Sequence, residues 1–234
     1  MQKSTTYSRI KTDYERVLKQ RNALLKSAGP ARKNNLDSVL ATLDIWNEQL
    51  INFGSQIILA RHQIINELLP YVSKSYAELA PSSKALNITY LPNASAENMT
   101  LNDLVTAMKQ KLQERQQDEL DRGLTLVGPH RDDLEIMIGE LPAKGYASHG
   151  ESWSVALALR LASFDLLKAT SPTGDPVLIL DDVFAELDVA RRNQLILRVK
   201  NVEQVLITAA VAEDVPKELV GNKLYVNNGK VDKI

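Results

Sequence analysis

The sequence contains no cysteine, which excludes disulfide bonds and metal sites built from thiolates. No apolar run approaches the roughly 18 residues that a membrane-spanning helix needs, and the N-terminal stretch is too polar and basic for a secretory signal. We therefore expect a cytoplasmic protein without membrane contact. The 28 Lys and Arg residues nearly balance the 29 Asp and Glu residues, so any nucleic-acid surface must be a local patch.

The printed sequence also lacks the pattern G-x-x-x-x-G-K-[ST], the loop that cradles the β- and γ-phosphates of a nucleotide. Its one Gly-Lys pair, Gly229-Lys230, is followed by Val231 in an expected C-terminal turn. We therefore expect that this chain by itself does not bind ATP measurably.

The most informative stretch that is present runs from Pro176 to Asp188 and reads P-V-L-I-L-D-D-V-F-A-E-L-D. Its four consecutive aliphatic residues predict a strand buried on both faces of a parallel sheet. Asp181 and Asp182 then lie at the carboxyl end of this strand, where open α/β sheets bind their ligands. One carboxylate can hold Mg²⁺ through water, and the other can orient a water for attack on a phosphate. A buried strand followed by an acidic helix cap, with no ligand site, would give the same sequence pattern.

A second informative stretch lies upstream, where Y-A-S-H-G-E-S-W-S-V-A-L-A-L-R-L-A-S-F spans Tyr146 to Phe164. Ser148 and Glu151 have capping-box spacing ahead of a periodic apolar run, which predicts a helix that begins at Ser148. A Ser-x-Gly at such an N-terminus presents free N–H groups and a hydroxyl to an anion. In isolation, the same residues are most often only a helix cap.

Residues 1 to 33 hold nine basic and two acidic residues, a local net charge of +7. Helical periodicity places six apolar residues on one face: Ile10, Tyr14, Val17, Leu18, Leu24 and Leu25. A neighbouring arc carries Arg9, Arg16, Lys19 and Lys26. This basic arc is either a solvated helix face or an edge that contacts phosphates. Gly29-Pro30 is expected to end the helix.

The remaining elements follow from apolar spacing and turn residues. A heptad-like seam from Leu36 to Ile64 predicts a long helix, weakened by Gly54 and kinked or ended at Pro70. A further helix is expected over residues 101–120 and another over residues 189–199. Strands are expected over residues 87–91, 124–127, 134–138, 205–208 and 223–226.

Taken together, S-H-G-E, V-L-I-L-D-D and A-E-L-D resemble the signature motif, the Walker B strand and the D-loop of ATP-binding-cassette (ABC) heads of the structural-maintenance-of-chromosomes type. Three further segments resemble the bacterial RecF family: G-P-H-R-D-D-L, D-Y-E-R-V-L-K-Q-R-N-A-L-L-K and Q-V-L-I-T-A-A. This resemblance covers nearly the whole chain. It implies an α/β fold in which residues 121–234 form part of an ABC-type ATPase head, a sheet flanked by helices, and residues 1–120 form a mainly helical lid domain.

The resemblance also implies site roles. Asp181 would hold Mg²⁺, Asp182 would polarise the attacking water, and Asp188 would act across a dimer. The signature would bind the nucleotide on the opposing protomer through Ser148, His149, Gly150 and Glu151, with His149 where Gln is common. Thr208 stands where transporter cassettes place a switch histidine. The chain would be the C-terminal portion of such a protein, and ATP and Mg²⁺ would require the missing phosphate loop.

The biological role implied is that of a recombination mediator in DNA repair, replication and the SOS response. Such a protein would be a weak DNA-dependent ATPase that forms an ATP-dependent homodimer on double-stranded DNA beside single-stranded gaps. It would load RecA through RecR, with RecO as an indirect partner. The basic arc, Arg9, Arg16, Lys19 and Lys26, would supply the DNA contacts.

Two other functions compete with this one. The chain could be a non-catalytic DNA- or protein-binding module. It could also be a metal-dependent nuclease that uses Asp132, Asp133, Asp181 and Asp182, although that would leave the signature helix unexplained. His130 and Arg131 could contact a nucleotide or a partner subunit, or they could belong to a turn in which Arg131 neutralises the aspartates. Arg160 could reach a carboxylate or the nucleotide, or it could be a surface residue.

Overall fold

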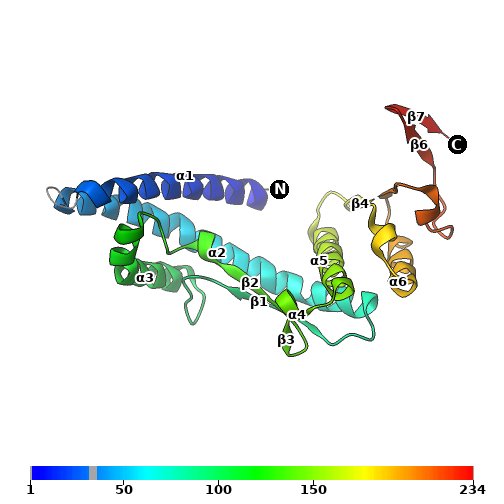
Figure 1. Cartoon of the computed structure of the whole chain (residues 1–234), viewed down its shortest axis with the longest axis horizontal. Helices are drawn as coiled ribbons and strands as arrows, with labels where there is room; N and C mark the ends of the chain where they lie inside the picture. The colour runs from blue at the N-terminus through cyan, green and yellow to red at the C-terminus, as the bar shows by residue number, and fades with distance from the viewer. Residues whose placement is uncertain (1, 32–35, 234) are drawn as a thin grey trace. The chain divides into compact units, whose positions relative to one another are not determined.

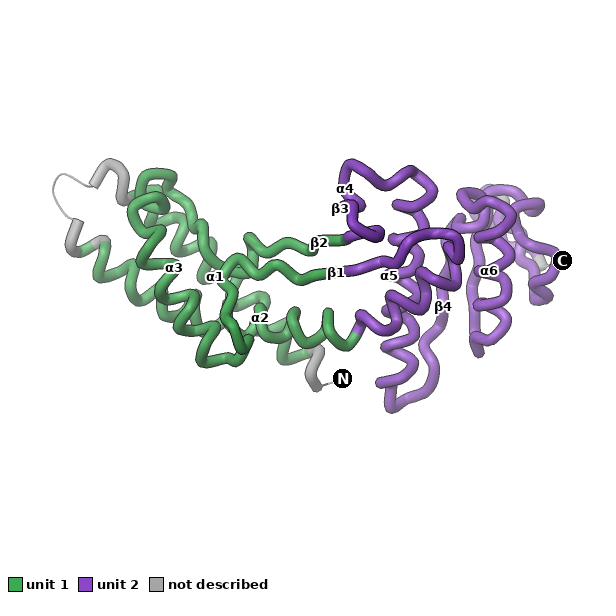
Figure 2. The backbone as a smooth tube through the Cα atoms, turned by 90° about the horizontal axis from the view of Figure 1, so that it is seen from below, with its two compact units in different colours: residues 1–67, 88–136 green, residues 68–87, 137–234 purple. Residues whose placement is uncertain are grey.

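A computed structural model describes residues 2–31 and 36–233, which group into two compact units (Figure 2). Unit 1 comprises Met1–Glu67 and Ile88–Ile136, and unit 2 comprises Leu68–Asn87 and Met137–Ile234. The fold is α/β, because both helices and short sheets build it. The expected lid–head boundary between residues 120 and 121 falls inside unit 1 and stays a prediction.

Three long helices build most of unit 1: α1 (Gln2–Ala31), α2 (Leu36–Leu79) and α3 (Leu101–Arg122). In unit 1 they lie side by side (Figures 1 and 2). The predicted apolar face of α1 is confirmed, since Tyr14 and Val17 join a buried cluster that also contains Leu50, Leu104 and Met108. Each such side chain stabilises the fold by about 1.5–3 kcal/mol when fully buried. The helix α1 ends at Ala31, one residue beyond the predicted Gly29-Pro30 stop.

The helix α2 continues through Pro70 to Leu79, so of the two outcomes predicted at this proline the helix end is wrong, and the kink stays a prediction. A proline inside a helix removes one backbone hydrogen bond. The turns beyond it nevertheless bury Val72, Tyr76 and Leu79, and this burial offsets the loss. Gly54 has a packing role, because a Cβ there would lie 2.7 Å from Met108 Cε of α3.

The expected strand over Leu124–Val127 does not form. Its backbone groups are satisfied by side chains instead. The N–H of Thr125 donates to Asn22 Oδ1 at 2.7 Å, and the N–H of Leu126 donates to Glu119 Oε1 at 2.7 Å. These bonds leave no donor at either residue for a sheet ladder.

The predicted strands on either side of this region do form. β1 (Leu86–Leu91) and β2 (Asp133–Ile138) belong to a three-stranded sheet in the order β1-β2-β3, with β3 at Leu141–Pro142. A short turn of helix, α4 (Ala143–Tyr146), follows β3.

Unit 2 contains the two sequence stretches that predicted a ligand site. The first forms α5 (His149–Thr170), and the second forms β4 (Leu178–Asp181) and the 3-10 turn η2 (Val183–Glu186). Next come α6 (Val189–Val199) and β5 (Val205–Thr208), which pairs with β4 in parallel. The chain closes with the hairpin of β6 (Leu224–Asn227) and β7 (Lys230–Lys233), whose turn residues Asn228 and Gly229 both have positive φ, as the turn signal predicts.

The prediction that β4 is buried on both faces is wrong. Leu178 and Leu180 are buried, whereas Val177 and Ile179 are 45% and 63% exposed. Successive side chains of a strand point to opposite faces, so one face of β4 is covered and the other is not. Leu206 of β5, opposite Ile179, is likewise 50% exposed. Within the described part of the chain β4 pairs only with β5.

In residues 2–31 and 36–233, no helix combines the length and the apolar composition needed to cross a membrane.

Candidate nucleotide site

Two acidic residues meet a threonine at the carboxyl ends of the parallel strands. The register places Asp181 of β4 opposite Thr208 of β5, and the Thr208 hydroxyl donates a hydrogen bond to Asp181 Oδ1. The N–H of Asp182 donates to both the carbonyl oxygen and the Oγ1 of Thr208, each at 3.2 Å. All three residues are exposed, so their remaining oxygen lone pairs face solvent.

Asp182 adopts a left-handed backbone conformation, with φ of 54°. For a residue with a Cβ this conformation costs about 1–2 kcal/mol. Such strain is typical of residues held for a function by their surroundings. Here the surroundings include the buried Phe184, whose carbonyl oxygen accepts a hydrogen bond from Arg192 Nη2 at 2.8 Å.

The donor chemistry of this edge fits Mg²⁺, which prefers oxygen ligands and keeps several waters when bound. Asp181 offers a carboxylate and Thr208 a hydroxyl. Among the described residues no three His, Cys, Asp or Glu side chains gather as a ready-made metal cage. A cation at Asp181 would therefore complete its shell with water and phosphate oxygens, as nucleotide-bound Mg²⁺ does.

The signature segment, residues 148–151, forms the N-terminus of α5 as a complete capping box, which confirms the predicted helix start. Ser148 Oγ accepts from the N–H of Glu151 at 3.2 Å, while the N–H and the hydroxyl of Ser148 donate to Glu151 Oε2 at 2.9 and 2.8 Å. These bonds, first that from the backbone, lower the pKa of the Glu151 carboxyl. The carboxylate thus occupies donors that an incoming anion would use. His149 is exposed at the first helical position.

Asp188 caps the N-terminus of α6. Its Oδ1 accepts from the N–H of Arg191 at 2.8 Å, and its Oδ2 pairs with the guanidinium of the same residue. The backbone hydrogen bond and the nearby positive charge lower the pKa of the Asp188 carboxyl. Asp188 is therefore ionised at neutral pH and held in one orientation.

The basic arc of α1 is exposed in unit 1. Arg9, Arg16, Lys19 and Lys26 all face solvent, and the Arg16 side chain is 71% exposed although it pairs with Asp13 at 3.0 Å. Arg21, which adds to the local charge in the sequence, is buried instead. Arg32 and Lys33 lie outside the described residues. The arc is open to a polyanion, and its geometry fits a solvated face and a phosphate-contacting edge equally well.

In the G-P-H-R-D-D turn, Asp132 is paired with a distant arginine rather than with the expected partner, Arg131. The Asp132 side chain, only 3% exposed, pairs with Arg61 Nη1 at 2.9 Å and accepts from the N–H of Asn93 at 2.7 Å and from the hydroxyl of Tyr90. Arg131 is exposed and donates to the carbonyl oxygen of Thr125 at 3.3 Å. With both oxygens engaged, Asp132 is not a free metal ligand, which removes support for a nuclease. Arg160 is exposed on α5.

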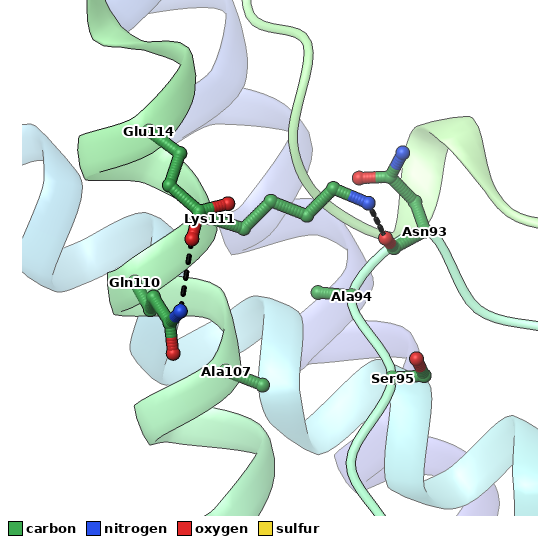
Figure 3. Close-up of a pocket in the computed structure, with 7 residues that line it drawn as sticks. All are labelled: Asn93, Ala94, Ser95, Ala107, Gln110, Lys111 and Glu114. Carbon is green, nitrogen blue, oxygen red and sulfur yellow. Dashed lines mark hydrogen bonds between the residues drawn. The ribbon is translucent and has the colours of Figure 1, made fainter.

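A separate pocket in unit 1 is lined by residues 93–95 and by α3 (Figure 3). Its polar groups are bonded to one another, since Lys111 donates to the carbonyl oxygen of Asn93 and Gln110 donates to Glu114 at 2.8 Å. None of the sequence motifs lies in it. The candidate site is therefore the set of motifs in unit 2.

Sequence reasoning missed Arg191 and Arg192, which contact the D-loop and the turn after Asp182. A signal was present, because the two arginines occupy the third and fourth positions after the helix cap Asp188. At these positions a side chain can fold back on the residues before the helix.

The fold and the site define the class of protein: an α/β fold in which the three segments that resemble a signature motif, a Walker B strand and a D-loop all lie in unit 2. No family model matches the chain. The curated relatives include a DNA replication and repair protein RecF from Streptomyces avermitilis, 49% identical over 96% of this chain, and one from Beutenbergia cavernae, 44% identical over the full chain. The chain spans 60% and 64% of their lengths.

Solved structures of RecF proteins are also similar to this chain. One of the recombination mediator protein RecF-ATPrS in the RecFOR pathway superposes with a TM-score of 0.83 at 28% identity, covering 98% of this chain and 59% of that chain. One of RecF-ATP superposes with a TM-score of 0.76 at 26% identity over the same shares. The chain is thus similar to RecF proteins over nearly its whole length.

Proposed function

We propose that this chain supplies the signature, Walker B and D-loop part of a RecF ATPase head, which binds DNA in an ATP-dependent manner as a recombination mediator. The observation that carries the proposal is the meeting of Asp181, Asp182 and Thr208 at the carboxyl ends of β4 and β5. Identity of 44–49% to RecF proteins supports it. The nucleotide is ATP, as in the name of the RecF-ATP structure, and Mg²⁺ is the matching cation.

Each residue has a role in this proposal. Asp181 holds Mg²⁺, which neutralises phosphate charge when bound, and Asp182 orients and polarises the attacking water. Ser148 and Gly150 contact the terminal phosphate on the opposing protomer, flanked by His149 and Glu151. Asp188 acts across the same interface. Catalysis in such a head is mainly positioning and charge stabilisation, so its residues can be divided between two subunits.

The DNA contacts are assigned to the basic arc of α1. Arg9, Arg16, Lys19 and Lys26 lie on one exposed side of a long helix, a geometry that can follow a phosphate backbone. The duplex beside a single-stranded gap is the proposed substrate, and the ATP-bound homodimer is the binding form. RecR is the proposed direct protein partner, with RecO and RecA reached through it, in recombination, replication and the SOS response, and the proposed location is the cytoplasm.

The division of the site between subunits provides a test. A signature acts on the partner's nucleotide, so this chain is expected to associate with full-length RecF of Streptomyces avermitilis when that protein is loaded with ATP. Ser148→Arg should abolish the association, because a long cation replaces the cap and fills the phosphate position. Sedimentation velocity with and without ATP measures the complex.

The matched control is Ser163→Arg, which places the same side chain at an exposed position further along α5. It is expected to leave the complex intact. A normal complex with Ser148→Arg would make Ser148 only a helix cap. DNA binding by the chain that is independent of ATP and of the relative would favour the non-catalytic module.

A further inference from the structure

The side chain of Arg191 lies between two motifs that are far apart in the sequence. Its Nη1 pairs with Asp188 Oδ2 in the D-loop. On the other side, a Cβ at Gly150 of the signature would lie 3.1 Å from Nη1 and 3.5 Å from both Cζ and Nη2. One guanidinium therefore contacts both motifs.

The glycine at position 150 needs a reason, because glycine is a poorer helix former than alanine and Gly150 lies in the first turn of α5. Its backbone supplies none, since Gly150 is not among the positive-φ glycines. The close approach of Arg191 does supply one. An alanine would bring its methyl group closer to Nη1 than nine in ten Cβ contacts allow, so the guanidinium would have to move.

The position of the Arg191 side chain also costs free energy. Its Nε is buried without a hydrogen-bond partner in the described structure, and a buried unsatisfied donor costs about 1–3 kcal/mol. The positive charge acts on the signature as well as on the D-loop, since it contributes to the lowered pKa of the Glu151 carboxyl. The ion pair with Asp188 is the favourable contact that keeps the side chain beside Gly150.

We propose that Arg191 is a positioning residue that couples the D-loop carboxylate Asp188 to the signature glycine Gly150, so that the two motifs move as one unit. The functional meaning of this coupling rests on the proposed function of both motifs. The planar fork of the guanidinium suits this role, because one edge can bind a carboxylate while its face lies against a backbone. The contacts of Arg192 go instead to the turn after Asp182.

The first experiment needs no nucleotide. The pKa of the Asp188 carboxyl is measured by NMR titration in this chain, in Gly150→Ala, in Arg191→Gln and in the double variant. Arg191→Gln should raise the pKa toward the ordinary aspartate value, in part only, because the backbone bond to Asp188 remains. Gly150→Ala should also raise it, by less, because a Cβ 3.1 Å from Nη1 forces the guanidinium to give way by a few tenths of an ångström and so weakens its pair with Asp188.

The double variant should show the same pKa as Arg191→Gln alone, because the methyl group then has no guanidinium to displace. Gly221→Ala is the matched control, since a Cβ there meets nothing within 4 Å and the backbone φ is not positive. Alanine is a better helix former than glycine, so loss of α5 is not expected in Gly150→Ala. An unchanged Asp188 pKa in Gly150→Ala, or additive shifts in the double variant, would overturn the coupling.

A second experiment links the coupling to function. In the association assay with ATP-loaded RecF, Gly150→Ala and Arg191→Gln should each weaken the complex, and their double variant should weaken it no further. Arg191→Lys should tolerate Gly150→Ala, because the flexible ammonium has no planar group against position 150. Absence of any ATP-dependent complex with the unmodified chain would count against the proposed function, while the NMR result would still decide the coupling.

Discussion

At the scale of single residues, polar side chains fix the turn at Gly128–Asp132. The ring of His130 has both nitrogens engaged: Nδ1 lies 2.6 Å from the Tyr14 hydroxyl, and Nε2 lies 3.1 Å from the carbonyl oxygen of Thr125. A carbonyl can only accept, so Nε2 carries the proton and Nδ1 accepts from Tyr14. Gly128, with φ of 129°, leaves room for that hydroxyl, which a Cβ would contact. The Tyr14 oxygen can also accept from a protonated Nδ1, so it is the lowered pKa of His130 that favours the neutral imidazole.

His130 should therefore make stability depend on pH. Burial lowers the pKa of His130 below its ordinary value of 6.5, and the charge of Arg131 acts in the same direction. The hydrogen bond to the Thr125 carbonyl, Asp132 and Glu119 act in the opposite direction. The unfolded chain then binds a proton at higher pH than the folded chain. Stability is complete above about pH 6.5 and falls as the pH drops through the lowered folded-state value.

The check is chemical denaturation between pH 7.5 and 5.0 of this chain and of His130→Gln, which keeps a donor for Thr125 but does not titrate. The variant should lose less stability over that range. Equal slopes against pH for the two proteins would contradict the assignment. His62→Gln, at a histidine whose Nε2 lies 3.0 Å from Asn66 Nδ2, controls for the substitution itself.

At the scale of elements, a buried ion pair fastens α1 to α3. Arg21 Nη2 lies 2.6 Å from Glu119 Oε2, with the two side chains 1% and 0% exposed. The remaining donors of Arg21 reach Asn47 at 2.9 Å and Thr125 at 2.8 Å, so the network also orients the segment that leads to the turn. Because every buried group in it is satisfied, breaking one member leaves the others uncompensated.

Glu119→Gln should destabilise unit 1 by about 3–5 kcal/mol, because Arg21 then keeps a buried charge without a partner. The free energy of unfolding is measured by denaturation in a Trp153→Phe background, where Trp46 of α2 becomes the only tryptophan and reports on unit 1. Asp13→Asn, which breaks the exposed Arg16 pair, is the control and should cost about 0–1 kcal/mol. Similar small losses in both variants would mean that the buried pair contributes little.

At the scale of the whole molecule, net charge is −1, so DNA binding depends on where the basic residues are placed. The α1 arc is one such place, and the residues proposed for ATP lie in the other compact unit. Each unit can therefore be altered without touching the residues of the other. This separation makes DNA contact and nucleotide action testable by independent sets of variants.

Arg9, Arg16, Lys19 and Lys26 changed together to alanine should weaken binding to gapped duplex DNA uniformly across sequences. The slope of log affinity against log salt should flatten by about 0.9 for each phosphate that the variant no longer neutralises. The control removes four exposed basic residues of unit 2: Arg160, Lys200, Lys217 and Lys223. An unchanged slope in the α1 variant, or an equal change in the control, would mean that the basic arc is a solvated helix face and does not contact phosphates.

The sequence by itself determined the elements whose signals are local. The helix α6 has the predicted bounds, β5 does too, and α5 begins at the predicted capping box, because caps and apolar periods act within a few residues. The motifs Ser148–Glu151 and Asp181–Asp182 were also recognisable in the sequence. Their place at a helix N-terminus and a strand end follows from the same local chemistry.

Only the tertiary structure decided what depends on distant partners. The segment Leu124–Val127 reads L-T-L-V and suits a strand, yet side chains of α1 and α3 accept hydrogen bonds from the N–H groups of Thr125 and Leu126. The burial of β4 depends on which elements cover its faces, and the continuation of α2 through Pro70 depends on packing beyond the proline. Asp132 pairs with Arg61, 71 residues away, rather than with its neighbour Arg131, and Arg191 meets Gly150 across two elements. Local spacing fixes which backbone conformation forms, whereas packing chooses among side-chain partners that the sequence alone leaves equal.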